Sequence, residues 1–248
     1  MATQYDTYWT DAPSWSSRKD AITVEEFSIF RKYLKHGTKC LDYGCGDADR
    51  YPRYLVSLGA NYTGYDISQV AVDKARASGL QAELFQTDNS IGCDAQTYDA
   101  AICLEVFEHL MEPDIALRDM HLALKLGGLL ITSVPNAAFW THRLEFLFTG
   151  FFNPGGSALT ARKAPWRDPH IRFFNPEMFR RFVRSCGFEI VEFRAEGFSL
   201  RSMPVVHRTP VFARFFHTLS WPVRFFGFIC PSLFSPRIFV VARKRILT

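Results

Sequence analysis

The stretch that decides the fold runs over residues 38–49: Thr38-Lys39-Cys40-Leu41-Asp42-Tyr43-Gly44-Cys45-Gly46-Asp47-Ala48-Asp49. An apolar run ends in an acid, a turn of small residues follows, and residues 50–55 can open a helix. Strand, glycine turn and helix in this order are typical of open α/β sheets, where the turn lets backbone N–H groups approach a ligand at the helix N-terminus. A Cβ at Gly44 or Gly46 would obstruct that approach.

Three more predicted strands follow, and a carboxylate stands at or just after the end of each. We expect these strands over residues 61–66, 80–86 and 98–104. Together with the first strand they give four acids at strand ends: Asp42, Asp66, Asp88 and Glu105. The carboxyl ends of parallel strands meet at one edge of a sheet, which is where open α/β sheets bind ligands. Four acids in register therefore indicate a binding site.

Five motifs over residues 38–136 occur in the order and at the spacing that is specific to one enzyme family. They are Leu41-Asp42-Tyr43-Gly44-Cys45-Gly46, Tyr65-Asp66-Ile67-Ser68, Thr87-Asp88-Asn89, the run from Tyr98 to Leu110 and the run from Leu126 to Asn136. These motifs resemble the class I S-adenosylmethionine-dependent methyltransferases, in particular the group that includes the ubiquinone-biosynthesis O-methyltransferases. Residues 170–177, His-Ile-Arg-Phe-Phe-Asn-Pro-Glu, are similar to that group as well. Ala48 replaces the family's usual third glycine, and alanine is small enough to keep the turn.

A dinucleotide-binding turn is the competing interpretation of the same stretch. That fingerprint needs glycines at i, i+2 and i+5, and the third position here is Asp49. An acid there would face a pyrophosphate of the same charge, whereas a cationic sulfonium tolerates nearby acids. The residues therefore favour the methyltransferase interpretation.

The resemblance implies one α/β domain with a doubly wound, seven-stranded, mostly parallel sheet, a Rossmann-like methyltransferase fold of strand order 3-2-1-4-5-7-6 with a C-terminal helical lid insertion. We expect the last three strands over residues 128–134, 188–194 and 237–244, the seventh antiparallel. Helices are predicted over residues 18–34, 52–58, 68–78, 113–126, 136–150 and 176–186, with Ser68 and Asn175 as N-caps. Within the single domain 1–248 we distinguish an N-terminal flap and helix (1–37), a cofactor-binding core (38–136), an acceptor-side insertion and helix (137–187) and the last two strands (188–248).

The implied cofactor is S-adenosylmethionine, which becomes S-adenosylhomocysteine. A carboxylate at Asp66 can accept hydrogen bonds from two vicinal ribose hydroxyls, and the resemblance places Asp88 and Asn89 at the adenine edge. Leu104 and Glu105 should flank the methionyl part, and Asp42 should act through the backbone of the loop and nearby water. The expected cofactor-binding residues are Asp42, Gly44, Cys45, Gly46, Asp66, Ile67, Asp88, Asn89, Leu104 and Glu105.

His109 and His170 are the candidate catalytic residues, and the role of His109 stays open. Glu105, Glu108 and His109 are spaced i, i+3 and i+4, so one helical turn would place all three on one side. In relatives of the ubiquinone type a similar Glu-x-x-Glu-His is associated with a divalent cation, although we do not favour a metal here. His109 is alternatively a general base for an acceptor hydroxyl, or a hydrogen-bonded structural histidine. His170 is the second candidate on the acceptor side.

Charge is divided along the chain. Residues 1–161 contain 13 Lys/Arg and 20 Asp/Glu, whereas residues 162–248 contain 16 and 5. Residues 197–236 form an insertion rich in Phe and Arg, in which Pro210 and Pro222 each can begin a short helix. Aromatic and basic residues without acids suit an anionic membrane surface, and a lid over the acceptor pocket is the alternative.

Six cysteines without metal or Cys-x-x-Cys spacing indicate a reduced, cytoplasmic protein. No signal peptide and no run of about 20 apolar residues is visible, so a membrane position would be peripheral, on the inner face. We therefore expect a methyltransferase acting on an oxygen of a small-molecule, glycan or lipid-linked acceptor. The alternatives are a non-catalytic cofactor-binding partner protein and, less favoured, an RNA methyltransferase, because Leu104–Phe107 lacks the Asn/Asp-Pro-Pro-aromatic motif of nucleic-acid amino-methylation.

Overall fold

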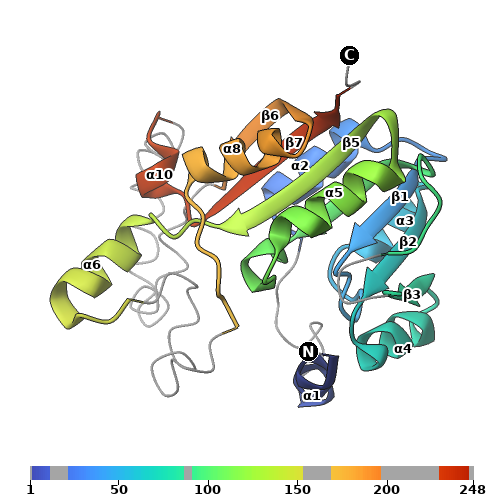
Figure 1. Ribbon diagram of the computed structural model, residues 1–248, viewed down its shortest axis with the longest axis horizontal. Helices are drawn as coiled ribbons and strands as arrows, with labels where there is room; N and C mark the ends of the chain where they lie inside the picture. Colours follow the sequence, from blue (N-terminus) through green and yellow to red (C-terminus); the bar gives the residue numbers. More distant parts are fainter. Residues whose placement is uncertain (1, 12–21, 87–90, 153–168, 197–228, 246–248) are drawn as a thin grey trace, which may run out of the picture.

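The computed structural model describes residues 2–11, 22–86, 91–152, 169–196 and 229–245. Its centre is a seven-stranded sheet of order β3-β2-β1-β4-β5-β7-β6, which confirms the predicted order (Figure 1). The strands are β1 (Lys39–Tyr43), β2 (Asn61–Asp66), β3 (Ala82–Leu84), β4 (Tyr98–Leu104), β5 (Leu124–Pro135), β6 (Phe188–Ala195) and β7 (Arg237–Lys244).

The register places the carboxyl ends of the parallel strands at one edge. On β1, Leu41 pairs with Thr63 of β2 and with Ala101 of β4, all in parallel. β7 is antiparallel to both of its neighbours, and its first residue, Arg237, pairs with Pro135 at the end of β5. The chain therefore enters β7 at the edge where the parallel strands end, and a β7 residue can contribute to a site there.

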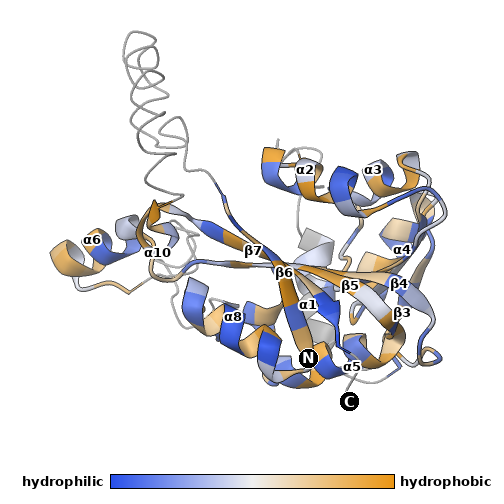
Figure 2. Cartoon of the chain, turned by 90° about the horizontal axis from the view of Figure 1, so that it is seen from above, coloured by the Kyte–Doolittle hydropathy of each residue, from blue (hydrophilic) through white to orange (hydrophobic). Residues whose placement is uncertain are grey.

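Helices cover both faces of the sheet. They are α1 (Ala2–Asp11), α2 (Val24–Tyr33), α3 (Pro52–Ser57), α4 (Gln69–Ala77), the 3₁₀ turn η2 (Phe107–His109), α5 (Pro113–Ala123), α6 (Trp140–Thr149), α8 (Pro176–Ser185) and α10 (Pro231–Phe234). Seen along the sheet, α2 and α3 lie on one face, and α5 and α8 lie on the other (Figure 2). The arrangement is the doubly wound α/β fold that the sequence predicts.

Alternate strand residues fill two separate cores. On the α5 and α8 face, Leu41 and Cys103 pack in one buried cluster with Met120 of α5 and Phe179 of α8. On the other face, Cys40, Ile102 and Ile131 pack with Phe30 of α2 and Leu55 of α3. Successive strand side chains point to opposite faces, so a strand that is buried on both sides is apolar throughout.

Three predicted helix boundaries are wrong, each because a local interaction ends or begins the helix elsewhere. The helix expected over 113–126 ends at Ala123, because β5 starts at Leu124, which pairs with Tyr98, and passes through Gly127 at a φ of 74°. The helix expected over 18–34 begins at Val24, where Thr23 and Glu26 form a capping box. The helix expected over 136–150 begins at Trp140, after a turn in which the Asn136 side chain bonds backbone groups.

The predicted caps of α4 and α8 are confirmed. Ser68 accepts a hydrogen bond from the Ala71 amide, and Asn175 accepts from the amides of Glu177 and Met178. Most of the segment 150–169, and the short helices expected after Pro210 and Pro222, lie outside the described residues. Among the helices that the structure describes, none combines the length and apolar character needed to cross a bilayer.

Asp42 is a core residue. Its place at the end of the first strand predicted instead a group that acts through the loop backbone and nearby water. Its side chain is fully buried, and its two oxygens accept hydrogen bonds of 2.7 Å from the hydroxyls of Tyr51 and Tyr62. Burial raises the pKa of Asp42 to about 7, although both tyrosine bonds favour the charged form. The carboxylate thus joins β1 to β2 and to the start of α3.

Asp42→Asn tests this burial through the pH dependence of stability. Between the ordinary aspartate pKa and about 7, the folded protein retains a proton on Asp42 that the unfolded chain has released, so rising pH favours unfolding. Asparagine lacks this titration. We expect the free energy of unfolding of the wild type to fall relative to Asp42→Asn as pH rises through this window, by about 1.4 kcal/mol per unit of pKa difference. Urea unfolding of both proteins at a series of pH values measures it.

Asp99→Asn is the matched control with the opposite sign. Burial acts to raise the pKa of Asp99, but bonds from the Lys125 side chain and the Lys39 amide outweigh it, so the pKa is lowered. The wild type should therefore gain stability relative to Asp99→Asn as pH rises through the acid range. If the free energy of unfolding changed with pH equally in Asp42→Asn and in the wild type, this would contradict the conclusion that Asp42 is buried and stays protonated up to a pH of about 7.

Candidate functional site

The turn after β1 takes the conformation that its small residues allow. Gly44, Gly46 and Ala48 all have positive φ angles, of 76°, 56° and 55°. A Cβ on Gly44 would lie 2.7 Å from Val106, and one on Gly46 would lie 2.6 Å from the ring of Trp9. Both glycines are therefore required by space as well as by φ. Ala48, the departure from the family pattern, keeps the left-handed conformation.

Asp66, at the end of β2, anchors this turn. One of its carboxylate oxygens accepts from the Gly46 amide at 2.8 Å, and the other accepts from the Ser68 amide at 2.9 Å. Burial raises the pKa of Asp66, and these backbone bonds act against it. Each carboxylate oxygen has two lone pairs, so Asp66 keeps capacity to accept from a ligand. Ile67, which follows it, is half-buried.

Helix α1 lies over the same turn. Asp6 accepts hydrogen bonds from the Ser68 hydroxyl at 2.5 Å and from the Val70 amide at 3.4 Å, at the N-terminus of α4. The Lys74 ammonium bonds the carbonyl of Trp9, whose ring packs on Gly46. The sequence predicts an N-terminal flap but gives no signal for these contacts, because no periodicity connects residues so far apart along the chain.

Leu104 and Glu105 end β4 beside this turn. Leu104 is buried, and Glu105 has a φ of 58°, a left-handed conformation that is uncommon for a residue with a side chain. The Glu105 amide donates to the Ser133 carbonyl, its carboxylate accepts from the Ser133 hydroxyl at 2.7 Å, and it forms an ion pair with Arg237. Asp88 and Asn89 lie outside the described residues.

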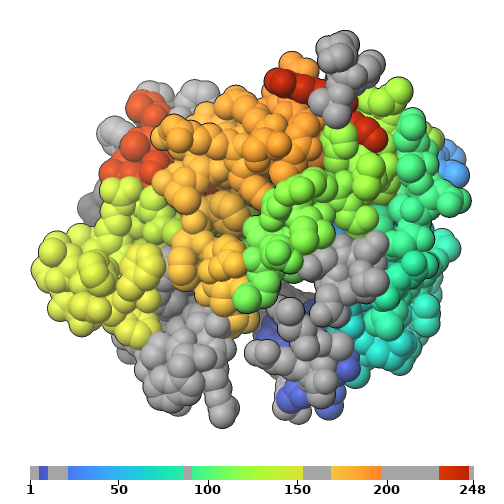
Figure 3. Space-filling view, viewed as in Figure 1, coloured from blue at the N-terminus to red at the C-terminus, as the bar shows by residue number. Residues whose placement is uncertain are grey.

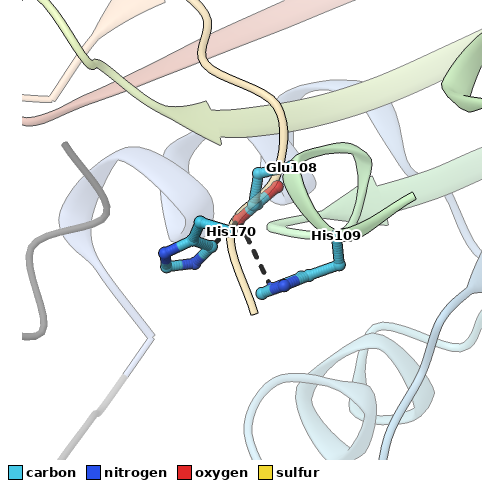
Figure 4. Close-up of side chains that lie close together, drawn as sticks. All are labelled: Glu108, His109 and His170. Atoms are coloured by element: carbon cyan, nitrogen blue, oxygen red, sulfur yellow. Dashed lines mark ion pairs between the residues drawn. The ribbon is translucent and has the colours of Figure 1, made fainter. Parts of the chain in front are cut away.

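A second group of polar side chains consists of Glu108, His109 and His170 (Figure 4). Glu108 and His109 belong to η2, and His170 comes from the segment before α8. Oε1 of Glu108 lies 3.8 Å from Nε2 of His109 and 4.0 Å from Nε2 of His170. The two imidazole rings stack with centroids 4.7 Å apart. The segment is held there because the amides of Ile171 and Arg172 donate to the Glu108 carbonyl.

The Glu108 carboxyl is nearly inaccessible, and neither of its oxygens has a hydrogen-bond partner among the described residues. Burial first, and then repulsion from Glu105, raise the pKa of Glu108 well above its usual range. A buried carboxyl without hydrogen bonds is costly unless it takes up a proton or a cation. Glu108 is therefore suited to share a proton with the two imidazoles or to bind a positive ligand.

The grouping of Glu105 with Glu108 and His109, expected from their spacing, is wrong. The left-handed Glu105 and the non-helical Val106 separate Glu105 from the turn that begins at Phe107. His170 takes the third place instead, and its distance in sequence explains why spacing alone could not find it. One ligand atom from each of Glu108, His109 and His170 falls within a mutual distance of 4.8 Å, so these three side chains fit a divalent cation.

An apolar cavity of about 500 Å³ opens next to the segment that carries His170. It is lined by Ala137, His142, Arg143, Phe146, Leu147 and Phe152. Phe152 contacts Phe173, with ring centroids 5.7 Å apart, and the Ala137 amide donates to the Phe174 carbonyl. Figure 3 shows α6 in yellow beside the orange segment that precedes α8, on one face of the molecule. The cavity thus lies beside the segment that carries His170.

Comparison with known proteins agrees with this geometry. A family model described as a methyltransferase domain matches residues 16–193. The chain is 31% identical over 121 residues to a ubiquinone biosynthesis O-methyltransferase of Actinobacillus pleuropneumoniae, covering 45% of this chain and 51% of that protein. It is 26% identical over 165 residues to one of Burkholderia pseudomallei, covering 64% and 67%. The chain thus spans half to two thirds of the length of these curated relatives.

Solved structures share the fold at low sequence identity. One is the putative methyltransferase solved in complex with the Trm112 methyltransferase activator of Haloferax volcanii, with a TM-score of 0.68, 15% identity and 98% coverage of both chains. Another is a SAM-dependent methyltransferase, described as a possible histamine N-methyltransferase, of Thermotoga maritima, with a TM-score of 0.63, 16% identity and coverage of 99% and 100%. The family match covers more than half of the chain. The chain therefore belongs to the methyltransferase-domain family.

Proposed function

We propose that this methyltransferase transfers the methyl group of S-adenosylmethionine to an oxygen of a small-molecule, glycan or lipid-linked acceptor. S-adenosylmethionine is its cofactor. The observation that carries the proposal is the buried Glu108 carboxyl between two histidines, in the turn that follows the cofactor edge of β4. Such a group accepts a proton, and an oxygen acceptor must lose one when it is methylated.

Apart from Asp42, the expected cofactor-binding residues keep in this proposal the roles that the family pattern implies. Asp66 accepts the ribose hydroxyls with its remaining lone pairs, Gly44, Cys45, Gly46 and Ile67 line the turn, and Leu104 and Glu105 flank the methionyl group. Asp88 and Asn89 meet the adenine edge. When bound, S-adenosylmethionine would supply a sulfonium-activated methyl group to the acceptor oxygen, and the sulfur would keep the electron pair of the broken carbon–sulfur bond. Positioning supplies much of the rate, because the sulfonium is already activated.

His109 is the proposed base. Its Nδ1 lies 3.2 Å from the Pro169 carbonyl, so the tautomer that donates there presents Nε2 as the proton acceptor. Nε2 lies 3.8 Å from Glu108, whose carboxylate would stabilise the imidazolium that forms. Nε2 of His170 lies 4.0 Å from the same carboxylate oxygen, and the His170 ring stacks on the ring of His109.

A divalent cation is the alternative at the same three side chains. Glu108, His109 and His170 would hold it, and it would lower the pKa of a bound acceptor hydroxyl. Carboxylate and imidazole donors suit several divalent ions without selecting one. A chelator should lower the activity if His109 is a metal ligand but not if it is a general base, so the two roles can be distinguished.

An amphiphilic acceptor is supported by the cavity beside α6. Its walls are largely apolar, and Phe146, Leu147 and Phe148 of α6 are more than half exposed. A polar group at the histidines and an apolar body along α6 would suit an acceptor of this kind. We propose further that the aromatic and basic residues 197–236 contact an anionic membrane, in which an amphiphilic acceptor dissolves. These residues lie mostly outside the described part of the chain, so this step rests on sequence.

Asp66→Ala tests the ribose assignment. We expect S-adenosylmethionine binding to weaken by about 1–3 kcal/mol, the scale for removing a charged hydrogen-bond partner. Titration calorimetry measures the affinity, and thermal unfolding checks that the variant is folded. Asp73→Asn, which changes an exposed acid of α4, is the control and should bind normally. Unchanged affinity in folded Asp66→Ala would overturn the assignment.

The reaction itself is tested with isotopically labelled S-adenosylmethionine in a host metabolite and lipid extract, followed by mass spectrometry. We expect label on an oxygen of an amphiphilic product. His109→Ala should lower turnover by about 10²-fold or more while cofactor affinity stays the same. His36→Ala, at an exposed position, should be fully active. If EDTA lowers the activity of the wild type as His109→Ala does, His109 acts as a metal ligand. If the label is found only in nucleic acid, a small-molecule, glycan or lipid-linked acceptor is excluded.

Membrane contact is tested by co-sedimentation with anionic and neutral liposomes. The wild type should bind the anionic liposomes at low salt and release as salt screens the arginines. A triple glutamate variant of Arg208, Arg214 and Arg224 should lose this binding. If the wild type stays in solution with anionic liposomes at low salt, residues 197–236 are better explained as a lid over the acceptor.

A further inference from the structure

Arg237 lies at the centre of a cluster of charged side chains, of which the mechanism above uses only Glu105. Its Nη1 donates to Oε1 of the buried Glu26 at 2.9 Å. Its Nε lies 3.4 Å from Glu196 and 3.7 Å from Glu105. Arg50 bonds the same oxygen of Glu26. One guanidinium therefore connects α2, the end of β4 and the end of β6.

The cluster reaches the cofactor edge from four directions. Arg50 follows the glycine turn, and Glu105 is the left-handed residue after β4. Glu26 uses its other oxygen to cap α2, by accepting from the Thr23 amide at 2.9 Å. Arg237 opens β7 opposite the end of β5. A planar fork of five N–H donors suits this position, because it can serve several carboxylates at once.

The charges of the cluster do not balance. Among the residues that the structure describes, two guanidinium groups, of Arg50 and Arg237, contact three carboxylates, which leaves one negative charge. Glu105 is the member that the proposed function assigns to the methionyl end of the cofactor, and that end carries an ammonium group. Burying unbalanced charge is unfavourable, so a cationic ligand group beside Glu105 would complete the cluster.

We propose that Arg237 is a positioning residue, which holds the Glu105 carboxylate so that it can bind the α-ammonium of the methionyl group. This inference rests on the proposed function, because it takes the placement of Glu105 from it. The Arg237 guanidinium and the Ser133 hydroxyl contact the same oxygen of Glu105. Together they fix a side chain whose backbone is in a conformation that costs free energy.

The test is calorimetric binding of S-adenosylmethionine and S-adenosylhomocysteine to four variants. Arg237→Gln and Glu105→Gln should each weaken both ligands about tenfold, since both ligands carry the ammonium. The double variant should bind no more weakly than Glu105→Gln alone, because Arg237 acts through Glu105. Arg237→Lys keeps the charge without the fork and should recover part of the loss.

Arg243→Gln is the matched control, an exposed arginine of the same strand far from the cluster, and it should bind normally. Thermal unfolding checks each variant; if Arg237→Gln does not fold, Arg237→Lys alone and with Glu105→Gln gives the same comparison. Additive losses in the double variant, or normal binding by Arg237→Gln beside weakened Glu105→Gln, would overturn the role of Arg237. Normal binding by Glu105→Gln would instead remove Glu105 from the cofactor site of the proposed function.

Discussion

The Asp66 carboxylate accepts backbone hydrogen bonds from Gly46 and Ser68, and it thereby joins the turn after β1 to the turn after β2. Both turns would otherwise leave buried amides without partners, which is costly. The left-handed angles of Gly44, Gly46 and Ala48 are tolerated because this carboxylate fixes where the turn must pass. The position of α1, whose Asp6 bonds Ser68 and whose Trp9 packs on Gly46, depends on the same junction.

Three of the other buried acids, Asp42, Glu26 and Glu108, are accommodated in different ways. Asp42 accepts from two tyrosine hydroxyls, and Glu26 pairs with two arginines. Glu108 has no hydrogen bond to either carboxylate oxygen among the described residues. The first two arrangements are complete within the protein and serve the fold. The arrangement of Glu108 is completed only by a proton or a ligand. Acids with pKa values shifted in this way are concentrated at functional sites.

The sequence predicts the caps of α4 and α8 and the turn with its strand-end acids, because these depend on local pattern and spacing. The sheet order follows from the resemblance to the methyltransferase family, and the structure confirms it. It misplaces the end of α5, since the pairing of Leu124 with Tyr98 competes with the helix and cannot be known before the sheet is assembled. It groups Glu105 with His109 by assuming one regular turn, which the left-handed Glu105 breaks. His170 and Arg237 come to the site from 61 and 132 positions beyond His109 and Glu105, so only the tertiary fold brings them there.

Strand β7 brings the basic C-terminal part of the chain into contact with the acidic core. The basic C-terminal third does not remain apart from the acidic core: its last strand inserts between β5 and β6, and Arg237 enters among Glu26, Glu105 and Glu196. Because β7 is antiparallel to both of its neighbours, its first residue rather than its last lies at the ligand edge. The insertion before β7 is thereby attached at the same edge, since the chain must leave β6 and enter β7 there. Long additions at this point can vary in sequence without disturbing the sheet, while their last residue remains tied to the cofactor side.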